Sequence, residues 1–300
     1  MNKILLIVSL LLCSKIFASS NPKIEIQGHR GARSVRPENT LAGFKYTLEN
    51  KIEVLEMDLS YTADRVLVVN HDAVINGTIC LDPNGQKIVK DLDIHKMTVA
   101  EIQKYDCGTL INPRFPRQTP SPKEKIPTFE DVLKLVKEHE KTQGMSFGLN
   151  VEIKVHNKFI TDNSQEIIKK IISLVKKYDL YERTVIQSFD INIIDQVRKL
   201  DSKIKTSFLI EQDFKSVLKA LKVSSLGELA KKYKFNILSP NHKLLSKAIV
   251  KELQAQGLQV IPWTANNVKE WQALLDMEVD GIITDDPVAL REFLNKKTTP

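Results

Sequence analysis

The strongest constraint on the fold of this chain is a regular alternation of short β-branched segments with longer segments of helical periodicity. Eight segments are expected to be strands: 24–28, 52–58, 148–153, 184–188, 205–209, 236–239, 258–262 and 280–283. The expected helices are 37–50, 128–141, 163–178, 190–200, 225–234, 243–256, 266–277 and 287–295. Eight strands alternating with eight helices predict an α/β fold, a (β/α)8 TIM barrel.

An open, doubly wound parallel sheet is the competing arrangement for such an alternation. That fold usually carries a glycine-rich phosphate loop, and no GxGxxG sequence follows any expected strand. Three expected helices begin with recognisable first-turn residues, namely Thr128 with Asp131 three positions later, Pro37, and Pro287. The barrel is therefore the predicted fold, with residues 21–300 forming one domain.

Residues 1–20 have the composition of a secretory signal peptide, which is removed from the mature protein. Residues 4–12 are almost entirely apolar, and small residues follow for cleavage after Ala18 or Ser20. This stretch is too short to span a membrane, so no stable membrane insertion is expected. A lipoprotein attached through Cys13 is disfavoured because a bulky leucine precedes that cysteine. The mature protein is expected to be periplasmic or secreted.

One connection interrupts the alternation. Residues 72–125 are rich in Asp, Asn, Gly and Pro, with one short helix expected at 98–101. A long insertion on this side of a barrel usually forms a lid or a wall of the site, so we expect a small inserted subdomain. Cys80 and Cys107 both lie in it and can form a disulfide in an exported protein. Two buried free thiols are the alternative, because the sequence does not give their separation.

The net charge of the chain is +7 at pH 7, and its surplus lysines are scattered over the expected helix faces. Lysines in such positions usually form a solvated surface. Nucleic-acid binding would need a basic patch interleaved with stacking aromatic residues, and the sequence contains none. We therefore expect no nucleic-acid partner.

Active sites of TIM barrels lie at the C-terminal ends of the strands, so the residues at those ends are the candidate site residues. Glu56 and Asp58 are two positions apart in the second expected strand, so their side chains point to the same face. Glu152 and Lys154 share a face of the third expected strand in the same way. Three carboxylates in a dry pocket cannot all stay ionised without a cation. The prediction is one divalent cation, Ca²⁺ or Mg²⁺, held by the three carboxylates.

Two histidines accompany these carboxylates. His29 ends the first expected strand within "GHRG", and His71 follows the apolar "VLVV". Because histidine titrates near neutral pH, these two are the candidate catalytic base and acid. The carboxylates could instead simply pair with Lys154 and Arg30, and the second histidine could belong to a turn. Their joint occurrence at successive strand ends favours the functional interpretation.

The residues quoted so far belong to a series of segments that resembles the glycerophosphodiester phosphodiesterase family, in its periplasmic type. The segments, in chain order, are "HRGARSVRPENT", "EMDLSYTADRVLVVNHD", "MTVAEIQKYDCG", "IPTFEDVL", "VEIK", "QSFD", "PWTANN" and "DGIITDDP". The resemblance implies a TIM barrel with a small inserted subdomain. It also implies hydrolysis of glycerophosphodiesters, such as glycerophosphocholine or glycerophosphoethanolamine, to glycerol 3-phosphate and an alcohol. One departure is Arg65, where the family favours Asp-Gly in the turn after the second strand.

The expected chemistry assigns a role to four further residues. Arg30 offers a planar fork to the phosphate, and Lys154 adds a point charge. Phe189 and Trp263 are expected to form an apolar wall for the glycerol, with core packing as the alternative. The nucleophile is either the 2-hydroxyl of the glycerol, which would give a cyclic phosphate, or water. Weaker candidates are Glu38, Asn39, Ser188 and Asp285.

Two other functions compete with this one. A lysophospholipase D or a sphingomyelinase D-like phosphodiesterase would need an apolar lip for an acyl chain, whereas the insertion here is mostly polar. A non-catalytic exported binding protein would be expected to have lost a histidine or a carboxylate, and all five are present. The expected partner is thus a small-molecule glycerophosphodiester. The oligomeric state is open, a dimer included.

Overall fold

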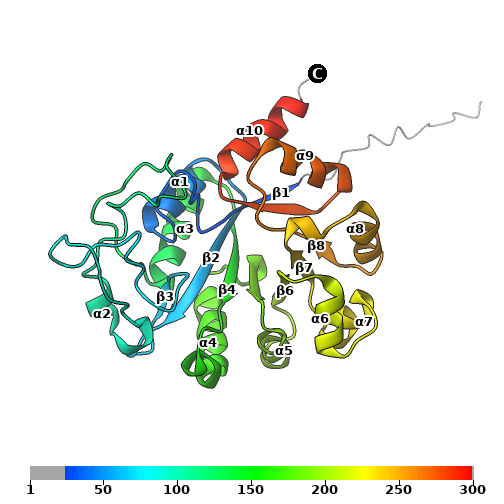
Figure 1. Cartoon of the computed structure of the whole chain (residues 1–300), viewed down its shortest axis with the longest axis horizontal. Coiled ribbons are helices and arrows are strands. Elements are labelled where there is room, and N and C mark those ends of the chain that lie inside the picture. The colour runs from blue at the N-terminus through cyan, green and yellow to red at the C-terminus, as the bar shows by residue number, and fades with distance from the viewer. Residues whose placement is uncertain (1–23, 299–300) are drawn as a thin grey trace, which may run out of the picture.

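A computed structural model describes residues 24–298 of the chain, so the predicted signal peptide lies outside the described residues. Eight parallel strands form the centre of the structure (Figure 1). They are β1 (Glu25–Gly28), β2 (Val54–Tyr61), β4 (Gly148–Ile153), β5 (Thr184–Ser188), β6 (Lys205–Ile210), β7 (Ile237–Pro240), β8 (Gln259–Val260) and β9 (Gly281–Thr284). The predicted strands are therefore all present, within a few residues of their predicted bounds.

The strands are ordered β8-β7-β6-β5-β4-β2-β1-β9, and each pairs in parallel with its neighbours. Backbone hydrogen bonds from Asp280 N to Val260 O (3.0 Å) and from Ile283 N to Pro262 O (3.0 Å) join the two ends of this order. The sheet is thus a nearly closed barrel, as predicted. The strand β8 is shorter than predicted; Pro262, which follows it closely, has no N–H to donate to a ladder.

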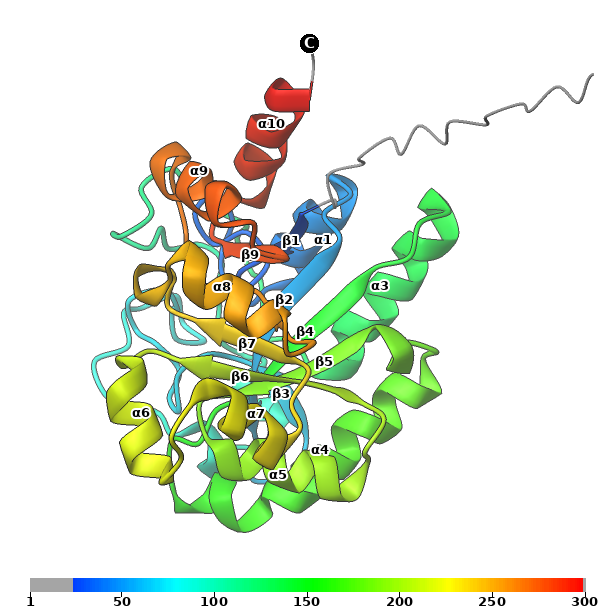
Figure 2. The same cartoon turned by 90° about the vertical axis from the view of Figure 1, so that its right-hand side faces the viewer.

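Helices follow the strands and pack around the outside of the barrel (Figures 1 and 2). They are α1 (Leu41–Glu49), α3 (Phe129–Gln143), α4 (Lys158–Lys177), α5 (Ile191–Leu200), α6 (Phe214–Leu221), α7 (Leu226–Tyr233), α8 (Lys247–Gln254), α9 (Val268–Met277) and α10 (Pro287–Thr298). Short 3-10 turns add η1 (Ile94–Lys96), η2 (Tyr181–Arg183) and η3 (His242–Leu244). Apolar stripes hold the helices in place; in α4, for example, Ile167, Ile171 and Val175 are buried against the barrel.

Two of the three predicted helix starts are confirmed. The side chains of Thr128 and Asp131 form a reciprocal capping box at the start of α3, and Pro287 is the first residue of α10. The prediction for Pro37 is wrong, because α1 begins four residues later, where Thr40 accepts a hydrogen bond from Gly43 N. The helix α6 was not predicted at all; it is short, and none of its residues is fully buried.

The insertion begins after β3 (Leu67–Val69), a strand that pairs antiparallel with β2. It contains α2 (Val99–Ile102) and a small apolar core of its own, whose buried members are Val68, Ile75, Cys80, Ile94, Ile102, Cys107 and Ile126. Cys80 and Cys107 are joined in a disulfide, which decides between the two alternatives for these cysteines. Arg65 has a φ of +60° in the β2–β3 turn, a conformation that costs a non-glycine residue about 1–2 kcal/mol. The hairpin that leads to His71 is nevertheless formed.

Candidate active site

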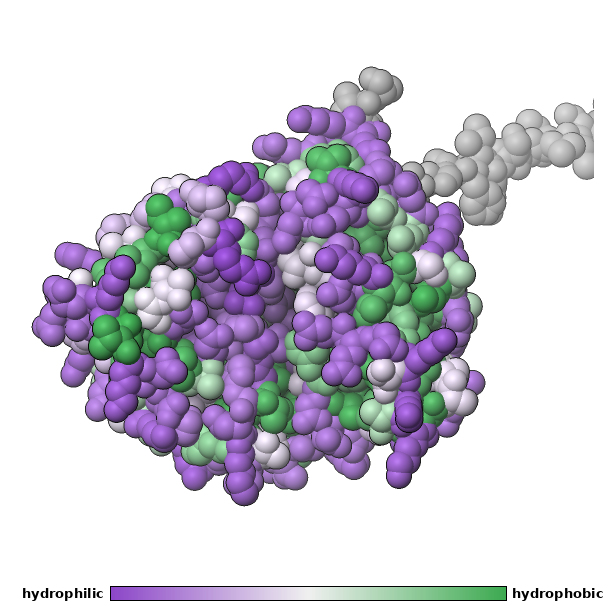
Figure 3. Space-filling model, viewed as in Figure 1, coloured by the Kyte–Doolittle hydropathy of each residue, from purple (hydrophilic) through white to green (hydrophobic). Residues whose placement is uncertain are grey.

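A cleft of about 1020 Å³ opens at the C-terminal ends of the strands. Its walls include His29 and Arg30, which follow β1, and His71, which follows β3, together with Glu56 within β2 and Glu152 near the end of β4. On the face drawn in Figure 3, a central hollow is lined mainly by hydrophilic residues, with hydrophobic side chains beside it. The predicted histidines and carboxylates are therefore brought to one place by the ends of neighbouring strands.

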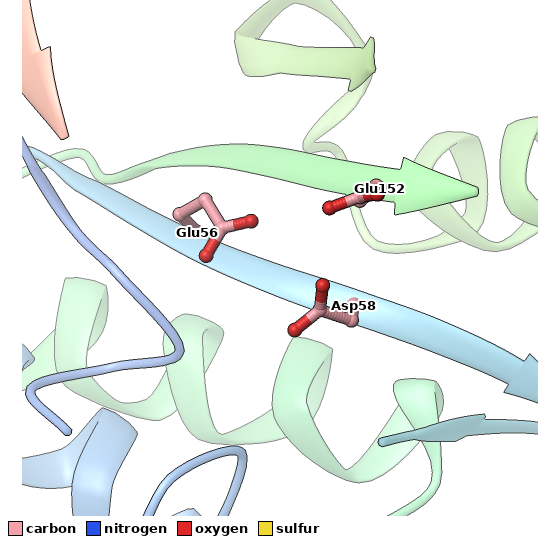
Figure 4. A group of neighbouring side chains, drawn as sticks. All are labelled: Glu56, Asp58 and Glu152. Atoms are coloured by element: carbon pink, nitrogen blue, oxygen red, sulfur yellow. The ribbon is translucent and has the colours of Figure 1, made fainter. Parts of the chain in front are cut away.

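Three buried carboxylates form the floor of this cleft. Asp58 of β2 is the register partner of Glu152 on β4, and Glu56 lies two residues earlier on β2. Figure 4 shows the three side chains directed into one space between these strands. Each offers an oxygen atom within 4.8 Å of those of the other two. The predicted metal-ligand set is thus the one cluster of this kind in residues 24–298.

The carboxylates are in electrostatic conflict. Burial, together with the neighbouring charges of Asp58 and Glu152, raises the pKa of Glu56 well above its usual value. Burial and the charge of Asp58 raise the pKa of Glu152 to about 8. Burial also opposes ionisation of Asp58, but Arg30 and Lys154 outweigh it and hold its pKa well below the usual range. The protein alone therefore does not balance the negative charge that this cluster would carry when fully ionised.

A divalent cation fits this arrangement. The Oδ1 atom of Asp58 is buried and accepts no hydrogen bond, which is costly for a carboxylate oxygen unless a ligand satisfies it. The donor set is made of carboxylate oxygens only, which hard cations such as Ca²⁺ and Mg²⁺ prefer. Glu56, Asp58 and Glu152 would be the residues that hold such an ion.

The two predicted cations lie against the same carboxylates. Lys154 Nζ donates to Glu152 Oε1 (3.0 Å) and lies 3.5 Å from Asp58 Oδ1. Arg30 Nε lies 3.3 Å from Asp58 Oδ2, and its Nη1 donates to Glu38 Oε1 (2.7 Å). The ion pairs with Lys154 and Arg30, which the sequence offered as an alternative to a functional role of the carboxylates, are thus present. Both cations also line the cleft, where a phosphate can reach them.

The turn after β1 is shaped by glycine. A Cβ atom on Gly28 would lie 2.2 Å from the carbonyl oxygen of Gly31, and Gly31 itself has a φ of +87°. Arg30 is also left-handed, with a φ of +50°, and its backbone N–H donates to Glu56 Oε2 (2.9 Å). This tight turn points His29 and Arg30 into the cleft while its backbone holds one of the carboxylates.

His29 is held by a carboxylate that the sequence ranked only as a weak candidate. Its Nδ1 atom lies 2.6 Å from Asp285 Oδ1, and its Nε2 atom lies 3.9 Å from Glu56 Oε2. Asp285 also accepts hydrogen bonds from Arg33 Nε (2.6 Å) and Asn266 Nδ2 (2.8 Å), two residues that the sequence reasoning missed. Burial and the charge of Arg33 lower the pKa of His29 to about 4. The imidazole is therefore neutral at pH 7, with Nε2 free to accept a proton.

His71 has a parallel arrangement on the opposite side of the cluster. Its Nδ1 atom lies 2.7 Å from Asp72 Oδ1, and Asn76 Nδ2 donates to the other oxygen of that carboxylate (2.9 Å). The backbone carbonyl of His71 accepts a hydrogen bond from His156 Nε2 (2.8 Å). Both ring orientations are thus set by an aspartate on Nδ1, which directs each Nε2 atom away from that partner.

The two aromatic residues pair at the edge of the cleft. Phe189 and Trp263 pack edge to face with ring centroids 5.3 Å apart, and Phe189 is 40% exposed. They form an open apolar wall, so core packing alone does not explain Phe189. Beyond this wall the cleft continues along α6, where Val217, Ala220 and Leu221 line it.

The comparisons with known proteins agree on one family. The model of the glycerophosphoryl diester phosphodiesterase family matches residues 29–289. A glycerophosphodiester phosphodiesterase of Caldanaerobacter subterraneus is 28% identical over 274 residues, covering 91% of this chain and 99% of the relative. A protein of Mus musculus named lysophospholipase D GDPD1 is 27% identical over 290 residues, covering 89% of this chain and 85% of the relative.

Solved structures give the same result. A Silicibacter pomeroyi protein, whose name assigns it to the glycerophosphoryl diester phosphodiesterases, superposes with a TM-score of 0.84 at 28% identity and covers 91% of this chain and 94% of its own. An Oleispira antarctica phosphodiesterase, solved with the product sn-glycerol 3-phosphate, has a TM-score of 0.72 at 20% identity, with 90% and 96% covered. The second likeness is evidence for the fold only.

Proposed function

Because this chain belongs to the glycerophosphoryl diester phosphodiesterase family, we propose that it hydrolyses glycerophosphodiesters such as glycerophosphocholine and glycerophosphoethanolamine. The products are sn-glycerol 3-phosphate and an alcohol. The observation that carries the proposal is the meeting of His29, His71 and three buried carboxylates in one cleft. Those groups supply proton transfer and a site for charge neutralisation, which the cleavage of an anionic diester requires.

The roles of the residues follow from their contacts. A divalent cation held by Glu56, Asp58 and Glu152 supplies Lewis-acid stabilisation of a non-bridging phosphate oxygen. Arg30 and Lys154 line the cleft beside these carboxylates and contact the phosphate from the protein side. Ca²⁺ and Mg²⁺ are the two cations that this oxygen-only site supports, and re-addition of each to the stripped protein distinguishes them.

Proton transfer is assigned to the histidines. His29 is neutral, and Asp285 occupies its Nδ1 atom, so Nε2 accepts the proton of the nucleophile. His71, oriented by Asp72, donates a proton from Nε2 to the oxygen of the leaving alcohol. The nucleophile is the 2-hydroxyl of the glycerol or a water molecule. Detection of a cyclic glycerophosphate by phosphorus NMR during turnover separates these two routes.

The second candidate function is lysophospholipase D activity, which the apolar wall favours. Phe189, Val217 and Leu221 extend the cleft with half-buried or exposed apolar side chains, on the side opposite the polar insertion. Such a wall can take an acyl chain, and a relative of this length is named for that activity. Choline release from glycerophosphocholine and from lysophosphatidylcholine compares the two substrates directly. A large preference for the lysolipid would replace the first candidate with the second.

We infer that the protein works in the periplasm or outside the cell. Two observations support this: the signal-like sequence of residues 1–20, and the disulfide between Cys80 and Cys107. In the described part of the chain, no helix is both long and apolar enough to cross a bilayer. Fractionation of cells that express the full chain tests this location, and recovery of uncleaved protein in the cytoplasm would contradict it.

The proposed function is tested by turnover of glycerophosphocholine, measured through the release of glycerol 3-phosphate. Substitutions His29→Ala and His71→Ala should each lower kcat by about a hundredfold or more, the usual contribution of general acid–base groups. His139→Ala is a suitable control, because that histidine bonds to the carbonyl of Leu135 on α3. Chelation by EDTA should abolish activity. Full turnover after exhaustive chelation would remove the cation from the mechanism. Near-normal turnover by either histidine variant would remove that histidine from it.

A further inference from the structure

A line of polar side chains crosses the interior of the barrel beneath the carboxylates. TIM-barrel interiors are usually filled by bulky branched residues such as Val, Ile and Leu. Here Gln27 on β1, Asn150 on β4 and Gln187 on β5 are all buried, with at most 2% of each residue exposed. Burying amides costs free energy unless they are hydrogen bonded, so their partners show what this line of residues does.

The hydrogen bonds form one continuous path to Glu56. Asn150 Nδ2 donates to Gln27 Oε1 (2.7 Å) and also to Gln187 Oε1 (2.9 Å). Gln187 Nε2 then donates to Glu56 Oε1 (2.8 Å), and at the other end Gln27 Nε2 donates to Glu25 Oε1 (2.7 Å). The path thus joins β1, β4, β5 and β2, and its two ends are carboxylates.

The hydrogen bonds of the path run outward from Asn150 toward both end carboxylates, so Asn150 sets their direction. A primary amide has a donor end and an acceptor end, so the orientation of each amide decides the orientation of the next. Asn150 uses its NH₂ group on both sides, which turns the carbonyl of Gln187 toward it and the NH₂ of Gln187 toward Glu56. If Asn150 were reversed, its oxygen would face two carbonyl oxygens.

This polarity has a cost that packing does not explain. The Oδ1 atom of Asn150 is buried and accepts no hydrogen bond. A buried unsatisfied acceptor costs about 1–3 kcal/mol, and Asn150 bears this cost while its NH₂ group satisfies two other buried carbonyls. The gain lies at the other end of the path, where Glu56 Oε1 receives a donor while its Oε2 is held by the backbone N–H of Arg30.

We propose that Asn150 and Gln187 are positioning residues that fix the Glu56 carboxylate as a ligand and thereby set the affinity of the site for its divalent cation. The inference rests on the cation site of the proposed function. Its particular content concerns Asn150, which is the register partner of Glu56 on β4 and whose side chain reaches the Glu56 carboxylate through Gln187. Substitution of outer partners of metal ligands typically weakens metal binding by about 10- to 100-fold.

Three variants test this with calorimetric titration of Ca²⁺ and Mg²⁺ into EDTA-stripped, dialysed protein. Asn150→Leu and Gln187→Met remove the amides with little change in volume. Asn150→Ser keeps a polar side chain at this position, but the serine hydroxyl is too short to reach both glutamines. The matched control is Ser207→Ala: Ser207 is equally buried in the barrel and is the register partner of Gln187, but its hydroxyl bonds to Ser239 (2.9 Å) and takes no part in the path to Glu56. Melting in EDTA reports the stability of each apo protein.

The expected result is a dissociation constant raised by about tenfold or more in those variants of Asn150 and Gln187 that still melt cooperatively in EDTA. A folded variant of Asn150 that binds the cation as the wild type does would overturn the inference, and so would an equal loss in Ser207→Ala. Turnover of the wild type is measured separately. Tight cation binding without hydrolysis would therefore contradict the proposed function and leave this inference standing.

Discussion

Removal of the disulfide between Cys80 and Cys107 should impair catalysis through His71. The disulfide lies behind that histidine: a small cavity is lined by both cysteines together with His71, Asp72 and Asn76. Cys80 N donates to the backbone oxygen of Asn76 (2.9 Å), and the Asn76 side chain holds Asp72, the partner of the imidazole. The cross-link thus anchors the segment that orients the proposed catalytic acid.

The size of the effect follows from the loop that the disulfide closes. The cysteines are 27 residues apart, and the chain-entropy relation gives about 3.5 kcal/mol for a loop of that length. This loss falls mainly on the insertion, which has only a small apolar core of its own. Each tenfold change in the ratio of open to closed insertion needs about 1.4 kcal/mol, so the loss raises that ratio by more than about a hundredfold, and turnover falls with the closed population.

The assay compares wild-type protein, with and without dithiothreitol, with the double substitution Cys80→Ser and Cys107→Ser. Turnover of glycerophosphocholine and limited proteolysis of residues 73–107 are followed in parallel. We expect reduction of the wild type and the double substitution to have the same effect on both measurements, and dithiothreitol to have no further effect on the variant. Unchanged turnover and unchanged cleavage in both cases would refute the reasoning.

Three further predictions concern single side chains. Asp285→Asn should lower kcat/KM by about tenfold to a hundredfold because His29 loses its orienting partner, whereas the neighbouring Asp286→Asn should stay near wild type in a steady-state assay. Thr128→Ala should lower the free energy of unfolding by about 1 kcal/mol in urea titrations, with unchanged kcat, because it removes a helix cap that does not line the cleft. Partial burial raises the pKa of Asp201. The hydrogen bonds that its carboxylate accepts from Tyr181 and Lys176 outweigh burial and lower the pKa to about 2. Asp201 stabilises the fold above the unfolded pKa of about 3.9, and this contribution is lost as the pH falls toward 2, so Asp201→Asn should flatten the acid limb of a melting-temperature profile.

The fold could be predicted from the sequence because its signal repeats. Most strands are short β-branched runs, and most of the helices around the barrel bury enough apolar residues to show a periodicity of 3.6. The helix α6 has no fully buried residue, since its apolar side chains pack only partly against the core and some of them also line the cleft. The start of α1 was misplaced at Pro37 because proline fits a first turn, and sequence alone does not show that Thr40 provides the cap.

The three carboxylates of the site could be predicted from the sequence, whereas the network of residues that holds Asp285 against His29 could not. Glu56 and Asp58 share a face because side chains alternate along a strand, and Glu152 was expected beside them because active-site residues of a barrel gather at its strand ends. Arg33 and Asn266 reach Asp285 across separate loops, so only the folded chain brings them together. The same holds for Asn150 and Gln187, whose contact depends on the register between β4 and β5.

The strained turn and the acidic cluster support each other. Arg30 and Asn39 both have positive φ angles, of 50° and 53°, and neither is a glycine. Such residues cost of the order of 1–3 kcal/mol each and persist only where the surroundings compensate. The compensation here comes from the cluster, because the Arg30 N–H donates to Glu56 and Asn39 Nδ2 donates to Asp58 (3.0 Å). The backbone conformation that brings His29 into the cleft therefore depends on the same carboxylates that would hold the cation, which ties the position of the proposed base to the integrity of the proposed metal site.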